Sequence, residues 1–128
     1  MFELRVEVEF PAGHHLPGYP GDCSRMHGHN WVLEVFARSR QLDSVGMAID
    51  FRALKSAVKA LAASWDHENL NEHPDFKDFN PTAENIARLA FERLSVAVQK
   101  IGNGAGWIDR VTVWENPHAS ATYFREGQ

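Results

Sequence analysis

A group of residues that could bind a metal lies within sixteen positions near the start of the chain: His14, Cys23, His27 and His29. Side chains alternate between the two faces of a β-strand, so His27 and His29 would point to the same face. Two imidazoles from one strand and a third from nearby make a three-nitrogen metal site. Such a site leaves one tetrahedral position open, as catalytic zinc sites do. The pattern indicates a metal enzyme with a thiol beside its metal.

The spacing alone leaves the role of Cys23 open. The thiol could be a fourth metal ligand, a buried inert group, or a nucleophile or base. The sequence separation also does not fix how close His14 or Cys23 comes to the pair formed by His27 and His29. An isolated His-x-His pair is common among ordinary surface histidines. Whether this pair binds a metal therefore depends on which residues the fold brings close to it.

The composition is ordinary for a soluble globular protein and disfavours several other classes. The 128 residues fit one domain, 1–128, with an adequate core. The formal net charge of −4 gives no basic face for nucleic acid, and no apolar run approaches the roughly 20 residues that a membrane helix needs. One cysteine cannot form an internal disulfide, and no signal peptide is visible at the N-terminus. We therefore expect a cytoplasmic protein without nucleic-acid or membrane partners.

Strands are expected to carry the histidines. Residues 2–10 alternate apolar and charged side chains, which is typical of a half-buried strand. Residues 11–22 hold three prolines and three glycines and are predicted to be a loop. A second strand is predicted at 29–38, and two more at 107–115 and 119–125.

Two amphipathic helices are expected between the strand pairs. One runs from Phe51 to about Ser64, with Asp50 as its N-cap. The other starts in the segment 80–84, which offers a capping side chain and a proline for the first turn, and continues to about Lys100.

The element order is therefore strand, strand, helix, helix, strand, strand. This order predicts an α+β domain in which a four-stranded antiparallel sheet carries two helices on one face. A short sheet of this kind leaves exposed edges, which proteins cover or pair. Oligomerisation by edge-to-edge pairing, closing the sheets into a ring or barrel, is expected.

These motifs, in this order, resemble the 6-pyruvoyl-tetrahydropterin synthase family, whose members have the tunnelling fold. The likeness runs from residues 10–14 to the last strand and includes the segments 46–51, 65–71 and 80–85. The resemblance implies that zinc is held by three histidines, that a cysteine and an Asp-His pair are catalytic, and that a glutamate anchors the pterin ring. The corresponding residues here are His14, His27 and His29 for zinc, Cys23, Asp66 and His67 for catalysis, and Glu115 for the pterin.

Three residues separate Cys23 from His27, a spacing that resembles the family branch of queuosine (7-deazaguanine) biosynthesis rather than the biopterin branch, where the spacing is usually longer. The implied activity is a zinc-dependent lyase reaction. It converts 7,8-dihydroneopterin triphosphate into 6-carboxy-5,6,7,8-tetrahydropterin, acetaldehyde and triphosphate, with Cys23 as the general base. The resemblance also implies a homo-oligomer, typically a hexamer, with sites at subunit contacts.

The chain departs from the family pattern at three positions. Asn116 follows the anchoring glutamate where threonine is frequent, His15 stands where arginine is common, and Glu68 stands where some relatives have a second histidine. Three alternative functions remain open: triphosphate elimination to a pyruvoyl product, a zinc- or pterin-binding oligomer without catalysis, and a generic zinc hydrolase. The hydrolase would need a carboxylate base beside the metal.

Overall fold

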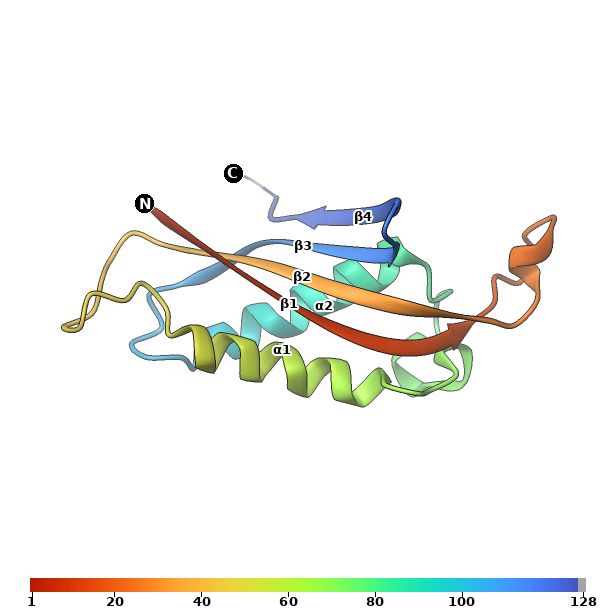
Figure 1. Ribbon diagram of the computed structural model, residues 1–128, viewed down its shortest axis with the longest axis horizontal. Coiled ribbons are helices and arrows are strands. Elements are labelled where there is room, and N and C mark those ends of the chain that lie inside the picture. The colour runs from red at the N-terminus through yellow and green to blue at the C-terminus, as the bar shows by residue number, and fades with distance from the viewer. Residues whose placement is uncertain (127–128) are drawn as a thin grey trace.

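The computed structural model describes residues 1–126 and contains the predicted elements in the predicted order (Figure 1). Single turns of 3-10 helix cover Asp22–Ser24, Leu70–Glu72 and Pro74–Phe76. The strands and α-helices are β1 (Phe2–His14), β2 (His27–Ser39), α1 (Phe51–Trp65), α2 (Ala83–Val98), β3 (Trp107–Asn116) and β4 (Ala119–Phe124).

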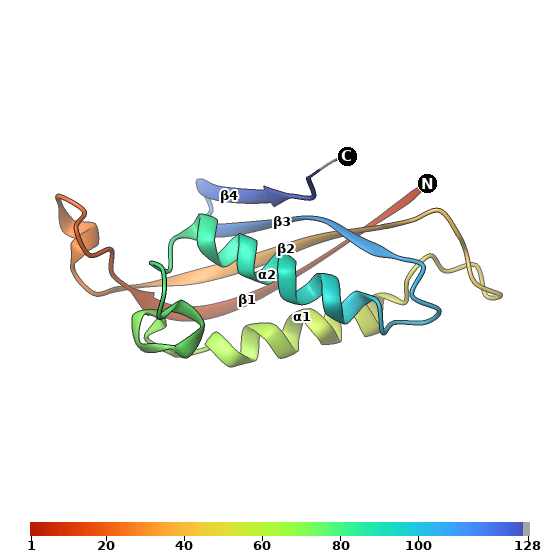
Figure 2. The ribbon, with the colours of Figure 1, turned by 180° about the vertical axis from the view of Figure 1, so that it is seen from behind.

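The four strands form one antiparallel sheet in the order β1-β2-β3-β4. Both helices lie on one face of this sheet, α1 against β1 and α2 against β3 and β4 (Figures 1 and 2). The predicted α+β arrangement is therefore confirmed. Within residues 1–126 the edge strands of the sheet are β1 and β4, and β1 is bridged on its outer side near Gly13 by Asn69.

The core lies between the sheet and the helices because each element turns an apolar face inward. Alternate residues of β2 are fully buried, and apolar residues at helical spacing on α1 and α2 pack against them. The helix-free face instead carries ion pairs, such as Arg5 with Glu34 and Arg38 with Glu3. The inward-facing residues include Trp31, Leu33, Val35, Ala37, Leu54, Val58, Trp65, Ile86, Ala90 and Leu94.

The prediction of a loop from residue 11 was wrong, because β1 continues through His14. Pro11 and Gly13 are compatible with a strand here because β1 is at the sheet edge, where a missing N–H breaks no ladder hydrogen bond. β2 likewise begins two residues earlier than predicted, at His27. The consequence is functional, because His14 and His27 become directly paired strand residues.

The helix starts follow capping chemistry, with one correction. Asp50 accepts a hydrogen bond from the backbone N–H of Arg52, as predicted for the N-cap of α1. For α2 the cap is Thr82, which accepts from the N–H of Asn85, so Pro81 precedes the cap and is not in the first turn. Of the helices within residues 1–126, none is both long and apolar enough to span a membrane.

Candidate metal centre

The β1–β2 pairing brings the three histidines together at one end of the sheet. His14 and His27 are opposite each other in the antiparallel ladder, and His29 follows on the same face of β2. The ring centroids are 4.5 Å apart for His14 and His27, 5.0 Å for His14 and His29, and 4.8 Å for His27 and His29. The expectation that His27 and His29 share a face is therefore met, and His14 is close enough to join them.

Glu115, near the end of β3, completes a group of four. One ligand-type atom from each of His14, His27, His29 and Glu115 lies within 4.8 Å of the others. The Oε1 atom of Glu115 is 3.4 Å from Nε2 of His14 and 3.3 Å from Nε2 of His29. The sequence identified Glu115 as a pterin-binding residue but gave no signal that it faces the histidines.

Two backbone carbonyls orient the imidazoles. The Nδ1–H of His14 donates to the carbonyl oxygen of Pro81 at 2.8 Å, and the Nδ1–H of His27 donates to that of Arg25 at 2.7 Å. A carbonyl oxygen can only accept, so each neutral ring keeps its lone pair on Nε2. Outer contacts of this kind fix the tautomer and orientation of metal-binding histidines. Sequence reasoning missed both carbonyls, because any residue type can supply one.

The unpartnered nitrogens fit a metal ion. Within the described part of the chain, the buried Nε2 atoms of His14 and His29 have no hydrogen-bond partner. Burial lowers the pKa of His14, and the neighbouring imidazoles add to this, while the hydrogen bond to Pro81 opposes it. Burial also lowers the pKa of His29, against an opposing effect of Glu115. Neutral imidazoles and a carboxylate are donors that suit a divalent transition metal such as zinc.

The predicted Asp66–His67 pair forms in the turn after α1. The Nδ1 atom of His67 is 2.8 Å from Oδ1 of Asp66, and His67 has a positive φ of 59°, which lets adjacent side chains face each other. The turn is held to β1 because the N–H of His67 donates to Pro11 O and the N–H of Gly13 donates to Glu68 O. The turn therefore brings the side chains of two adjacent residues into contact.

A shallow groove of about 370 Å³ is lined by one residue of the pair and one residue of the metal cluster. His67 and His29 both line it, together with Gly13 and Gly28, which face each other across the β1–β2 ladder. The imidazole of His67 is 80% exposed. It is therefore free to contact a bound molecule that reaches the histidines.

Cys23 lies apart from the four clustered side chains. It is in the turn Asp22–Ser24, in the loop that joins β1 to β2 and extends beyond the end of the sheet (Figure 1). The thiol is exposed, which excludes the alternative of a buried inert group. Within residues 1–126 the thiol is not part of the group of metal-ligand atoms, so the geometry does not favour it as the fourth ligand.

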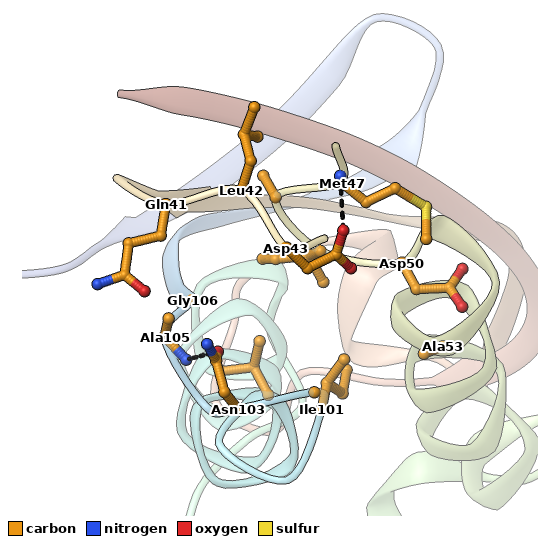
Figure 3. A pocket seen from close by; sticks show the side chains of 14 residues that line it. Gln41, Leu42, Asp43, Met47, Asp50, Ala53, Ile101, Asn103, Ala105 and Gly106 are labelled. Atoms are coloured by element: carbon orange, nitrogen blue, oxygen red, sulfur yellow. Dashed lines mark hydrogen bonds between the residues drawn. The ribbon is translucent and has the colours of Figure 1, made fainter. Parts of the chain in front are cut away.

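A second pocket, of about 330 Å³, lies at the opposite end of the sheet between the β2–α1 and α2–β3 loops (Figure 3). Its two carboxylates have structural partners. Asp43 accepts from the N–H groups of Val45 and Met47, and Asp50 caps α1. These contacts account for both acids as loop-forming residues, so the chemistry is concentrated at the histidine end.

Known proteins resemble this chain over nearly its whole length. The family model described as 6-pyruvoyl tetrahydropterin synthase matches residues 3–126. Two curated relatives carry the name 6-carboxy-5,6,7,8-tetrahydropterin synthase. The Bacillus subtilis protein is 29% identical over 127 residues, 95% of this chain and 84% of the relative. The Synechocystis protein is 33% identical over 129 residues, 97% and 94% of the two chains. The solved structure of Caenorhabditis elegans 6-pyruvoyl tetrahydropterin synthase aligns with a TM-score of 0.83 at 28% identity, covering 98% of this chain and 96% of that one.

Proposed function

The chain belongs to the 6-pyruvoyl tetrahydropterin synthase family, and we propose that it is a zinc-dependent carbon–carbon lyase of queuosine biosynthesis. It would convert 7,8-dihydroneopterin triphosphate and water into 6-carboxy-5,6,7,8-tetrahydropterin, acetaldehyde and triphosphate. The observation that carries the proposal is the cluster of three imidazoles, of which His29 lines the same groove as His67 of the Asp66–His67 pair. The names of the curated relatives support this product over others.

We propose that the zinc ion is held by His14, His27 and His29. Their Nε2 lone pairs converge, and the carbonyls of Pro81 and Arg25 hold two of the rings in place. When bound, zinc would act as a Lewis acid that makes a C–H group beside a substrate hydroxyl more acidic. Neutral imidazole ligands leave its full positive charge available for that purpose.

Proton transfer is assigned to Cys23 and to the Asp66–His67 pair. The exposed thiol of Cys23 is the proposed general base that removes a proton from the substrate side chain. Asp66 holds Nδ1 of His67, so the opposite nitrogen of that ring is free to give or take a proton. The substrate would lie between these groups and the histidines.

Glu115 is proposed to hold the pterin ring. A carboxylate can accept two parallel hydrogen bonds, here from the exocyclic amino group and the neighbouring ring N–H of the pterin. Its side chain is about one-third exposed, so one face of the carboxylate can be reached by a ligand. The neighbouring Asn116 uses its side-chain oxygen to accept from the N–H of His118, which fixes the turn beside the site.

We infer that the protein works as a homo-oligomer, a hexamer by family resemblance. Two observations support this: within residues 1–126 the β4 edge and the β1 edge before Pro11 have no strand partner, and the proposed catalytic groups Cys23 and His67 are exposed in one chain. A partner subunit would exclude water from them. A thiol that must stay reduced also favours the cytoplasm.

The test is to incubate the zinc-loaded protein with 7,8-dihydroneopterin triphosphate and identify the pterin product by mass. Carboxy-tetrahydropterin together with acetaldehyde is the expected result. A pyruvoyl product would assign the chain to the second candidate function, which the likeness to the Caenorhabditis elegans enzyme favours. Zinc binding without turnover would instead support a binding oligomer and contradict the lyase proposal.

A further inference from the structure

We propose that Glu115 is a fourth ligand of the metal ion in the substrate-free protein, and that the substrate must displace it. The inference rests on the metal site of the proposed function and adds a resting state to it. In that state the carboxylate closes the coordination shell that the three histidines leave open.

The separations between donor atoms fit shared coordination. A tetrahedral ion with bonds of about 2.0–2.1 Å keeps its ligand atoms roughly 3.3–3.4 Å apart. The Oε1 atom of Glu115 is 3.4 Å from Nε2 of His14 and 3.3 Å from Nε2 of His29. These two separations match neighbouring corners of one tetrahedron.

The same contacts do not fit hydrogen bonds. A charge-assisted N–H to carboxylate bond is about 2.7–2.9 Å long, shorter than either separation. Moreover, His14 uses its Nδ1–H on Pro81, so its buried Nε2 directs a lone pair at the carboxylate. Lone pairs facing one another over a short distance repel, unless a cation lies between them and accepts all of them.

Strand alternation places Glu115 on the face of β3 that carries Val113, which pairs with Leu33 on the histidine face of β2. In the β3–β4 ladder Trp114 pairs with Ser120 and Asn116 pairs with Ala119, which leaves Glu115 between them without a partner. Bulges of this kind bend the strand and are frequent beside functional sites. Glu115 is thus held by backbone geometry in a position where its carboxylate reaches the metal site.

The exchange would give one carboxylate two successive roles. Bound to the ion, it would neutralise one of the two positive charges and leave no open position for substrate. Displaced by the substrate, it would restore that charge and become available to the N–H groups of the pterin. Substrate binding would thereby increase the Lewis acidity of the metal ion.

The experiment uses cobalt(II) as the probe, because its visible absorption reports the ligand set without any turnover. We expect Glu115→Gln to weaken cobalt binding by at least tenfold relative to wild type and to shift the absorption bands. Glu68→Gln is the matched control, since it removes one carboxylate from the groove beside His29 but not from the cluster. It should bind cobalt within twofold of wild type with the same bands.

A second Glu115 variant and a substrate analogue provide further tests of the proposal. Glu115→Asp retains the charge but shortens the reach, so it should fold and still shift the bands. Unchanged affinity and bands in both Glu115 variants would overturn the ligand assignment while leaving the lyase proposal intact. If wild type bound no metal, both proposals would fail. Finally, 7,8-dihydroneopterin, which lacks the triphosphate, should alter the absorption bands of the wild-type cobalt protein. If it bound without changing these bands, the proposed displacement of Glu115 would be refuted.

Discussion

The side-chain amide of Asn71 makes two hydrogen bonds to the backbone of His15. Its Oδ1 accepts from the His15 N–H at 2.8 Å, and its Nδ2 donates to the His15 carbonyl oxygen at 2.9 Å. The amide thereby extends the β1 edge by imitating a strand partner, directly after the proposed ligand His14. The contact involves only the backbone of His15, so histidine in place of the family's usual arginine does not affect it.

We predict that Asn71→Ala lowers metal affinity several-fold as well as stability. The loss of two part-buried hydrogen bonds should cost about 1–3 kcal/mol of unfolding free energy, and His14 would be held less tightly. Chelator competition and denaturant unfolding measure the two effects. Asn71→Asp, which keeps the acceptor but places a carboxylate oxygen against the His15 carbonyl, should be at least as harmful. Wild-type metal affinity in both variants would refute the positioning role.

Cys23→Ala is expected to keep the fold and the metal but to lose turnover. The thiol is exposed and lies outside the histidine cluster, so its removal should leave the metal content unchanged. Loss of a general base typically lowers the rate by about 10²–10⁴-fold. Metal analysis and product formation are measured on the same sample, with Ser24→Ala as the neighbouring control. Loss of metal in Cys23→Ala would show that the thiol is a ligand.

The strand and helix pattern was predictable because the apolar residues alternate or recur at helical spacing. The end of β1 was the exception, because Pro11 and Gly13 are typical of loops. They are compatible with a strand here because β1 is at the edge of the sheet. The two-residue period of a strand predicts that His27 and His29 share a face of β2. The proximity of His14 to them depends on the β1–β2 register, which the sequence does not reveal.

The carboxylate in the cluster could not have been predicted in the same way. Strand alternation puts Glu115 on the same face of β3 as Val113, but its approach to the histidines depends on the β2–β3 register, which pairs Val113 with Leu33. The orienting carbonyl of Pro81 depends on where α2 starts, which the sequence placed slightly too early. The residue types that could bind the metal were therefore predictable from the sequence. The backbone carbonyls that orient them depend on how the flanking loops fold.

His67→Gly and His67→Ala should differ in stability but not in activity. Both remove the proposed acid–base group, so both should lose turnover equally. A left-handed φ of 59° costs a residue with a Cβ atom about 1–2 kcal/mol, a cost from which glycine is free. We therefore expect the glycine variant to be more stable than the alanine variant by about 1 kcal/mol in denaturant unfolding. Equal stability would mean that the turn relaxes when the imidazole is removed.

Asp75→Asn should reduce stability near neutral pH by about 1–2 kcal/mol. Asp75 accepts two hydrogen bonds from Arg93 at 2.7 and 2.8 Å and one from Trp65 at 2.9 Å, and so connects α1 with α2. Partial burial is the largest single effect and opposes ionisation. The hydrogen bonds from Arg93 and Trp65, together with the nearby positive charge, outweigh it and hold the pKa of Asp75 below its ordinary value. The contribution is thus present above about pH 3.9 and is lost as the pH falls through the lower folded-state pKa.

The difference between wild type and Asp75→Asn should accordingly shrink as the pH is lowered toward 2. Urea unfolding at several pH values measures it, and the exposed Asp78→Asn serves as the control. A difference that stayed constant down to pH 2 would show that the carboxylate charge does not contribute.

The metal-free protein should become less stable as the pH falls below about 6.5. Burial lowers the pKa of His14 and of His29 in the folded state. In the unfolded chain these groups have their ordinary pKa, near 6.5, so the unfolded state takes up protons first. The free energy of unfolding then falls by up to about 1.4 kcal/mol per pH unit for each extra proton bound by the unfolded state. It levels off once the pH is below the folded-state pKa values. His14→Gln should flatten this slope in urea unfolding between pH 7.5 and 5, whereas the exposed His118→Gln should not. Because the same neutral imidazoles are the proposed metal ligands, we expect metal affinity to decline over the same pH range, and an affinity that rose with acidification would contradict histidine ligation.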